Sequence, residues 1–224
     1  MIPVMLFAAG FGTRMGDLTK NKPKPLIEVA GKPLIDHALS MAEQIQPSRI
    51  VANLHYLPDL LAEHLTGCAV TLSHEAPEIL DTGGGLKAAM PLLESETVIT
   101  MNTDAIWAGA NPLRMLLEHW TPSKMDALLM CVPVEQAVGH TGTGDFDTGA
   151  DGRITRGSDL IYGGVQILKT EGLNAIEDRV FSLNRLWDRM QRNDRLFGTI
   201  YPDRWCDVGH PQGIPLAEAL LADV

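Results

Sequence analysis

Cysteine is scarce in this sequence, and long apolar runs are absent. The three cysteines, Cys68, Cys131 and Cys206, stand alone and form no C-x-x-C pair. This spacing excludes a disulfide framework and the usual zinc sites, and it fits a reducing compartment. The apolar run Ile2–Phe7 is too short to cross a membrane and lacks the basic flank of a signal peptide. We therefore expect a cytoplasmic protein with no membrane partner.

Positive charge is also in short supply. The 224 residues include 18 Lys and Arg against 28 Asp and Glu, which gives a formal net charge of −10. The overall field of such a chain repels nucleic acid and anionic membranes, so neither is expected as a partner. With 45% hydrophobic and 21% charged residues, the composition is otherwise that of an ordinary globular protein. The length suffices for one α/β domain, and we expect a monomer or a small homo-oligomer.

Short apolar runs with strand character alternate with helical patterns in the first half of the chain. This alternation predicts an α/β protein, a Rossmann-like three-layer sandwich with a mostly parallel mixed sheet. The expected strands are Ile2–Phe7, Arg49–Leu54, Ala69–His74 and Thr97–Met101, and the expected helices are Pro33–Ile45, Pro58–Leu65 and Gly85–Leu93.

The second half shows the same signals less regularly. Asn111 before Pro112 marks the start of a helix that runs to about His119, and Ser182 is expected to cap another amphipathic helix. The segment 139–159 is rich in Gly, Thr and Asp, which favours hairpins or loops. No repeat or linker divides the chain, so a single domain over residues 1–224 is expected. Further strands are expected at Met125–Val132, Leu160–Leu168 and Leu196–Tyr201, and a closing helix at Pro211–Ala222.

The most informative segment is Phe7-Ala-Ala-Gly-Phe-Gly-Thr-Arg-Met-Gly16, which directly follows the first expected strand. Its glycines let the backbone approach a ligand closely, and Arg14 and three lysines up to Lys24 add positive charge. Amide donors and clustered cations after a strand are what a polyphosphate requires. The dinucleotide fingerprint is incomplete because Met15 replaces its third glycine, and the Walker pattern is absent because Asp17 replaces its lysine.

Four blocks of the sequence resemble the sugar-1-phosphate nucleotidylyltransferases in order and spacing. The first is Ala8-Ala-Gly-Phe-Gly-Thr-Arg-Met15, followed by Lys22-Pro-Lys-Pro-Leu26. The second, from Glu75 to Ala89, is similar to the branch that uridylylates N-acetylmuramate 1-phosphate in cell-wall recycling. Met101-Asn-Thr-Asp104 resembles the family's metal-binding Asn-Gly-Asp, and Trp205-Cys-Asp-Val-Gly209 resembles its C-terminal Trp-x-Asp-x-Gly.

The resemblance implies a fold of the nucleotidyltransferase and glycosyltransferase-A type, with nucleotide contacts within about 1–110 and sugar contacts within about 111–224. It also implies that Asp104 and Asp207 hold Mg²⁺, the expected cofactor. Both aspartates follow apolar runs, so both are expected at strand ends, where ligands of open α/β sheets gather. Thr103 replaces the family's glycine. Because a β-branched residue disfavours positive φ, either this position is extended or the turn is reshaped.

Two cations carry the implied catalysis. Arg14 is expected to bind the β- and γ-phosphates, and Lys24 to bind the α-phosphate and the incoming sugar phosphate. Glu75 could accept a hydrogen bond from uracil or from guanine, so the base stays open. Asn102 and Asp145 are the expected partners of sugar hydroxyls. The other implied nucleotide contacts are Ala8, Ala9, Gly10, Gly12, Thr13, Gly83 and Gly84, and Gly164 completes the implied sugar contacts.

These residues favour an Mg²⁺-dependent enzyme that joins a nucleoside triphosphate and a sugar 1-phosphate and releases pyrophosphate. UTP and N-acetylmuramic acid 1-phosphate are the favoured substrates. Mannose 1-phosphate with GTP, or a phosphocholine cytidylyltransferase, are alternatives with the same chemistry. A nucleotide-binding regulator without catalysis ranks last, because both implied metal carboxylates and both implied phosphate cations are present.

Overall fold

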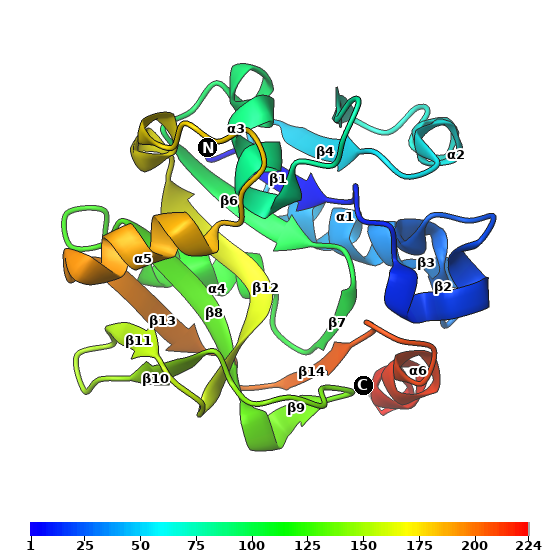
Figure 1. The fold of residues 1–224 in the computed structure, drawn as a ribbon. Coiled ribbons are helices and arrows are strands. Elements are labelled where there is room, and N and C mark those ends of the chain that lie inside the picture. The colour runs from blue at the N-terminus through cyan, green and yellow to red at the C-terminus, as the bar shows by residue number, and fades with distance from the viewer. Residues whose placement is uncertain (224) are drawn as a thin grey trace.

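A computed structural model describes residues 1–223. Its main sheet has nine strands, seven of which follow one another in the order β11-β10-β12-β6-β1-β4-β5, while β8 pairs with β12 and β13 pairs with β8 (Figure 1). Along residues 1–223, no helix has both the length and the apolar character required to cross a bilayer. The strands are β1 (Val4–Phe7), β4 (Ile50–Leu54), β5 (Val70–His74), β6 (Thr97–Asn102), β8 (Ala127–Pro133), β10 (Phe146–Thr148), β11 (Ile154–Arg156), β12 (Leu160–Lys169) and β13 (Leu196–Ile200).

The predicted α/β fold with a mixed sheet is confirmed. Strands β6, β1, β4 and β5 run parallel to one another, as the alternation of strands and helices in the first half requires. The second half differs, because β12 runs antiparallel to both β6 and β8. The 139–159 segment contains the hairpin β10–β11, in agreement with its turn-rich composition.

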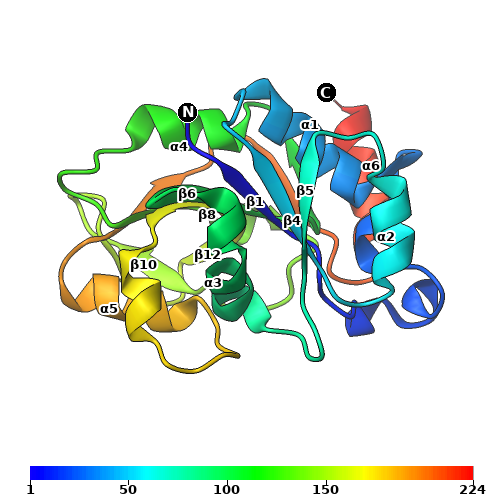
Figure 2. The ribbon, with the colours of Figure 1, turned by 90° about the horizontal axis from the view of Figure 1, so that it is seen from above.

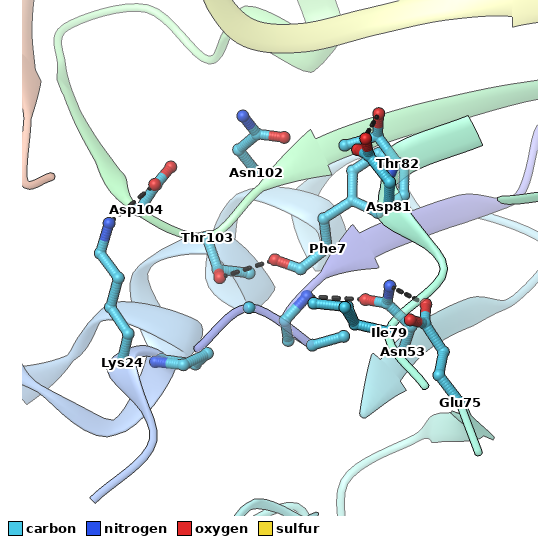
Figure 3. Close-up of a pocket in the computed structure, with 14 residues that line it drawn as sticks. Phe7, Lys24, Asn53, Glu75, Ile79, Asp81, Thr82, Asn102, Thr103 and Asp104 are labelled. Carbon is cyan, nitrogen blue, oxygen red and sulfur yellow. Dashed lines mark hydrogen bonds and ion pairs between the residues drawn. The ribbon is translucent and has the colours of Figure 1, made fainter. Parts of the chain in front are cut away.

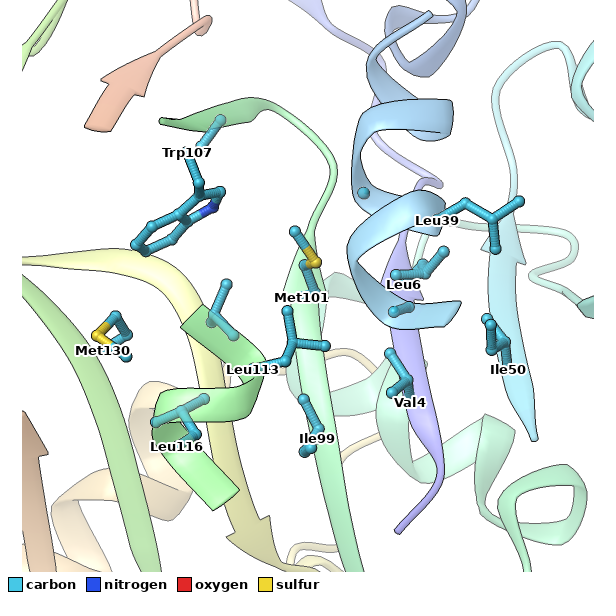
Figure 4. Close-up of a cluster of buried hydrophobic side chains, with 14 of the residues drawn as sticks. Val4, Leu6, Leu39, Ile50, Ile99, Met101, Trp107, Leu113, Leu116 and Met130 are labelled. Carbon is cyan, nitrogen blue, oxygen red and sulfur yellow. The ribbon is translucent and has the colours of Figure 1, made fainter. Parts of the chain in front are cut away.

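Helices cover both faces of the sheet, which gives the three expected layers (Figure 2). Side chains along β1 point alternately to the two faces of the sheet: Val4 and Leu6 are buried in one apolar cluster and Met5 in the other. The first face carries α1 (Leu34–Gln44), α2 (Pro58–His64) and α4 (Pro112–His119), whose side chains include Leu39, Leu113 and Leu116 of Figure 4. The second face carries α3 (Asp81–Leu93) and α5 (Asn184–Arg192).

A second, three-stranded sheet lies beside the main one and was not expected. It consists of β7 (Ala105–Ala108), β14 (Arg204–Asp207) and β9 (Ala137–Val138), and it packs against α6 (Gly213–Ala222). Its strands are too short to give a recognisable pattern in the sequence. The remaining elements are one hairpin and four 3-10 segments. The hairpin is β2–β3 (Glu28–Val29 and Lys32–Pro33), and the 3-10 segments are η1 (Thr13–Thr19), η2 (Lys24–Leu26), η3 (Val134–Gln136) and η4 (Glu171–Ala175).

Helix α2 begins at Pro58 as predicted, whereas α1 and α6 begin one and two residues later than predicted, at Leu34 and Gly213. Asn111 caps α4 as predicted, since its Oδ1 accepts hydrogen bonds from the amides of Leu113 (2.9 Å) and Arg114 (3.4 Å). Helix α5 begins at Asn184, with Leu183 and not Ser182 in the cap position. Helix α3 begins at Asp81, four residues before the predicted start, so the glycine run that follows Thr82 belongs to the helix.

Candidate active site

A cleft of about 250 Å³ opens at the carboxyl ends of β1, β4 and β6 (Figure 3). Parallel strands of an open α/β sheet end at the same edge, and ligands of such sheets bind there. Loops from four parts of the sequence meet at this edge. The lining residues are Phe7, Ala8, Ala9, Gly10, Lys24, Pro25, Asn53, Glu75, Ile79, Asp81, Thr82, Asn102, Thr103 and Asp104.

Lys24 and Asp104 form the charged end of this cleft. Lys24 Nζ lies 2.8 Å from Asp104 Oδ2, and the lysine side chain is 11% exposed. Burial by itself would raise the pKa of Asp104, but the ammonium of Lys24, aided by Arg14, lowers that pKa below its usual value. The structure thus brings an expected phosphate ligand and an expected metal ligand into direct contact.

Asp207 reaches the same place through the second sheet. Strands β14 and β7 are antiparallel with Asp207 opposite Ala105, and the amide of Val208 donates to the carbonyl of Asp104 at 2.8 Å. This pairing sets the two aspartates side by side although they are far apart in the sequence. Burial and the Asp104 carboxylate raise the pKa of Asp207, against the effects of nearby cations.

Arg14 lies next to Asp207, and Gly209 leaves the space for both. A Cβ placed on Gly209 would lie 2.8 and 2.9 Å from the carboxylate oxygens of Asp207 and 3.0 Å from Arg14 Nη1. The Arg14 side chain is exposed, and no hydrogen bond or ion pair ties its guanidinium to another residue within 1–223. Its donors are therefore available to a ligand.

Gly12 shapes the loop between β1 and η1. Its φ of +64° is left-handed, and a Cβ there would meet Lys24 Cβ and Thr19 Cγ2 at 2.9 Å. Gly12 therefore acts on Lys24 through packing and does not line the cleft. Gly10 does line it, and a Cβ on Gly10 would meet nothing within 4 Å. Thr13 is exposed and begins η1 outside the cleft.

Thr103 occupies the position of the missing family glycine without a left-handed backbone. It is not among the positive-φ residues of the described chain, and it lies in the bend between β6 and β7. Its buried hydroxyl donates to the carbonyl of Phe7 at 2.9 Å, which ties the end of β6 to the end of β1. A glycine would leave that link unmade.

Glu75 is buried and lies at the other end of the cleft, but its oxygens already have partners. Oε1 accepts from Asn53 Nδ2 and Oε2 accepts from the Leu80 amide, both at 2.7 Å, while Asn53 Oδ1 accepts from the Ala8 amide at 2.7 Å. This chain of hydrogen bonds positions the loops after β1 and β5 relative to the end of β4. Glu75 thus supports one wall of the cleft.

Gly83 and Gly84 lie outside the cleft, contrary to expectation. Their amides both donate to the carbonyl of Phe181, at 2.9 and 3.0 Å. A Cβ on Gly83 would overlap the Phe181 ring, and one on Gly84 would overlap the carbonyl of Arg179. These glycines serve close packing of α3 against the segment before α5, and no amide of theirs is left for a nucleotide.

A second pocket of about 250 Å³ adjoins the first, with which it shares Phe7, Asp81, Thr82 and Asn102. Two of the expected sugar contacts, Asn102 and Asp145, line it. The third, Gly164, does not, but its φ is +95° and a Cβ there would lie 3.0 Å from Asn102 Cβ. Gly164 therefore makes room for Asn102. The rest of the lining is Asp145, Tyr162, Ser182, Leu183, Asn184 and Trp187.

Comparisons with known proteins agree with this geometry. The sequence pattern of the MobA-like NTP transferase domain matches residues 4–151. The chain belongs to this nucleotidyltransferase family. An N-acetylmuramate alpha-1-phosphate uridylyltransferase of Caulobacter vibrioides is 40% identical, over 98% of this chain and 96% of that protein. The protein of the same name from Neisseria meningitidis is 30% identical, over 96% of each chain.

The fold also matches solved structures. A putative glucose-1-phosphate thymidylyltransferase from Bacillus anthracis superimposes with a TM-score of 0.81, over all of this chain and 96% of that one, at 17% identity. At that identity the likeness concerns the fold alone. The superposition confirms the predicted fold type, and the family pattern and the relatives confirm the predicted membership of the sugar-1-phosphate nucleotidylyltransferases.

Several residues of this nucleotidyltransferase site escaped the sequence interpretation. Asn53 offered a signal, because it is the one polar side chain in the buried apolar strand β4 and stands near its carboxyl end. Asp81 was passed over in favour of the Thr82–Gly85 segment that follows it. Asn184 and Trp187 resemble ordinary helix positions, and only the packing of α5 over β12 brings them to a pocket.

Proposed function

We propose that this nucleotidyltransferase transfers the uridylyl group of UTP to N-acetylmuramic acid 1-phosphate, with Mg²⁺, in cytoplasmic cell-wall recycling. The observation that carries the reaction is the meeting of Lys24, Arg14, Asp104 and Asp207 at one edge of the sheet. The choice of substrates is supported by the relative that is 40% identical over nearly its whole length. The chain acts as one domain, with most nucleotide contacts before residue 110.

The chemistry requires alignment and charge stabilisation rather than a covalent intermediate. An oxygen of the sugar phosphate attacks the α-phosphorus of UTP, the bond from that phosphorus to the bridging oxygen breaks, and pyrophosphate leaves. Lys24 would hold the α-phosphate and the attacking phosphate together, and Arg14 would bind the leaving β- and γ-phosphates. The attacking phosphate is ionised near neutral pH, so no general base is needed.

Asp104 and Asp207 fit a magnesium ion. Within residues 1–223, no group of three or more His, Cys, Asp and Glu side chains forms a complete metal cage. Mg²⁺ commonly takes only one or two carboxylates and completes its octahedron with phosphate oxygens and water. Two adjacent carboxylates at the phosphate end of the cleft match that donor set. When bound, the ion would neutralise charge that develops on the phosphates.

The decisive experiment measures pyrophosphate release over a grid of substrates. UTP, GTP, CTP and ATP are each combined with N-acetylmuramic acid 1-phosphate, N-acetylglucosamine 1-phosphate, mannose 1-phosphate and phosphocholine, with Mg²⁺ and with EDTA. The proposal predicts the highest kcat/KM for UTP with N-acetylmuramic acid 1-phosphate, and none of that activity in EDTA. If another pair of substrates gave the highest kcat/KM, the proposed substrates would be wrong but the proposed reaction would stand. If no pair released pyrophosphate, the proposed reaction would be overturned.

A further inference from the structure

The second pocket has an unbalanced set of charges for the acceptor just proposed. Its lining contains two charged side chains, Asp81 and Asp145, and both are negative. Asp145 Oδ2 accepts from the amide of Tyr162 at 2.9 Å, which leaves its other oxygen for a ligand hydroxyl. N-acetylmuramic acid differs from N-acetylglucosamine by an ether-linked lactyl arm that ends in a carboxylate. These two aspartates would repel that carboxylate, so it needs a cation at the rim of the pocket.

Arg156 is placed to supply this cation. Its Nη2 donates to Oδ1 of Asn184 at 2.9 Å, and its guanidinium carbon lies 5.8 Å from the centroid of the Trp187 ring. Asn184 and Trp187 both line the pocket. Arg156 therefore contacts two walls of the pocket from its outer side, although it lies on β11, well away in the sequence.

The guanidinium of Arg156 is held in place with one end free. Asp188 Oδ1 accepts from Nε at 3.3 Å and from Nη2 at 2.8 Å, and the Phe146 ring lies 4.9 Å away, directly across the β10–β11 ladder. Within residues 1–223, Nη1 has no hydrogen-bond partner. A fixed guanidinium with a free edge is suited to a carboxylate, because little side-chain entropy remains to be lost on binding.

The surfaces beneath Arg156 are rigid as well. The Trp187 indole donates to Gln166 Oε1 at 2.8 Å, and its ring meets that of Tyr162 edge to face at 4.9 Å. Trp187 cannot turn without breaking the buried bond to Gln166. Arg156 therefore stacks on an indole ring that a buried hydrogen bond to Gln166 fixes in place.

Arg179 and Arg185 are paired with carboxylates, as Arg156 is with Asp188, but within residues 1–223 neither of them donates to a residue that lines the pocket. Arg179 pairs with Glu78 and donates to the carbonyl of Ala76. Arg185 pairs with Asp178 and lines a different pocket, on the η4 side of α5.

We propose that Arg156 is the specificity-determining residue that binds the carboxylate arm of the acceptor sugar. The inference rests on the proposed function, since it concerns the acceptor pocket of the same reaction. Lys24 and Arg14 handle the phosphates common to all acceptors, whereas Arg156 would recognise the one group that distinguishes N-acetylmuramic acid 1-phosphate from N-acetylglucosamine 1-phosphate.

The test compares both acceptors with UTP in the wild type, in Arg156→Gln and in Arg156→Lys. The wild type should prefer the carboxylate-bearing acceptor by kcat/KM. Arg156→Gln should lower that preference by about 10- to 100-fold, the range expected for a charge-assisted hydrogen bond, through a higher KM for N-acetylmuramic acid 1-phosphate. Arg156→Lys should restore part of the preference, because it keeps the charge and loses the planar fork.

Arg153→Gln is the matched control. Arg153 lies on the same hairpin, pairs with Asp151 and stacks on Phe197, away from both pockets of the site. The Arg153→Gln variant should keep the wild-type preference between the two acceptors. Thermal unfolding checks that every variant is folded. Equal losses with both acceptors, or an unchanged preference in Arg156→Gln, would overturn the role of Arg156 while leaving the proposed function intact. A wild type that does not use N-acetylmuramic acid 1-phosphate would overturn both.

Discussion

At the scale of single residues, the site depends on charges that face each other at close range. Lys24 meets Asp104 at 2.8 Å, and Gly209 keeps Arg14 and Asp207 close together by having no side chain. A phosphate or a metal that enters must exchange these contacts for its own. Without a ligand, these charged side chains lie next to side chains of the opposite charge, which limits the free-energy cost of burying them.

Asp104→Asn tests the proposed role of Asp104 as a ligand of Mg²⁺. The substitution keeps the size of the side chain but removes the charge, so we expect kcat to fall by roughly 100-fold or more. Thermal unfolding should show a folded protein. Asp151→Asn, which removes an exposed carboxylate paired with Arg153, should retain activity. Near-normal turnover by Asp104→Asn in steady-state assays of pyrophosphate release would contradict the assignment.

Gly12→Ala tests the backbone of the loop between β1 and η1. The alanine would have to keep a φ of +64°, and its Cβ would lie 2.9 Å from Lys24 Cβ and from Thr19 Cγ2. We expect a loss of about 1–3 kcal/mol in the free energy of unfolding, measured by denaturant titration. Gly10→Ala should leave that free energy nearly unchanged, because Gly10 has neither positive φ nor a neighbour within 4 Å. Equal stability of the two variants would show that the loop tolerates the strain.

At the scale of elements, three strand ends are joined by one carboxylate. Asp126 precedes β8, and its Oδ1 accepts from Lys169 Nζ at the end of β12 (2.9 Å) and from Arg195 Nε before β13 (2.8 Å). Backbone hydrogen bonds run between the same three residues. Burial raises the pKa of Asp126, but hydrogen bonds from Arg195 and Lys169 lower it more, so the pKa in the folded protein lies below the usual value.

Asp126→Asn should therefore destabilise the protein in a pH-dependent way. A carboxyl whose pKa is lowered by folding stabilises the folded state above its unfolded pKa of about 4, and that contribution disappears as pH falls toward the folded pKa. We expect the variant to lose about 1–3 kcal/mol at pH 7, with the difference from wild type shrinking below pH 4. Denaturant titrations at several pH values measure this. A difference that stays constant with pH would mean that packing, not charge, explains the loss.

At the scale of the whole molecule, the two sheets meet at the site, and neither supplies it alone. The main sheet carries Asn102 and the loop to Asp104, and the second sheet carries Asp207 on β14. A ligand bound between them ties both sheets together. It should therefore stabilise the entire fold and not only one loop.

A thermal-shift measurement checks this coupling. UTP with Mg²⁺ at 100 times its dissociation constant should contribute about 2.7 kcal/mol and raise the Tm by several degrees. EDTA should remove most of that shift, because the proposed ion links the triphosphate to Asp104 and Asp207. Asp207→Asn should reduce the shift as well. A shift that is the same with and without the metal would contradict the proposed arrangement.

Local signals in the sequence were enough for most elements, whereas the reaction type came from four motifs that resemble one family. Asp104 could be placed because it directly follows an apolar strand, and Asn111 because a cap acts on the amides two and three residues further on. Gly12 and Lys24 lie within one short segment. The strand before Asp104 and the cap at Asn111 each involve only a few consecutive residues, so the pattern along the chain contains the information.

The tertiary structure decided which groups face the ligand. The oxygens of Glu75 accept hydrogen bonds from Asn53 and Leu80, the amides of Gly83 and Gly84 donate to Phe181, and Trp187 lines the second pocket. These outcomes depend on how segments far apart in the sequence pack and pair. Burial and hydrogen-bond saturation are properties of that packing, and no local spacing determines them.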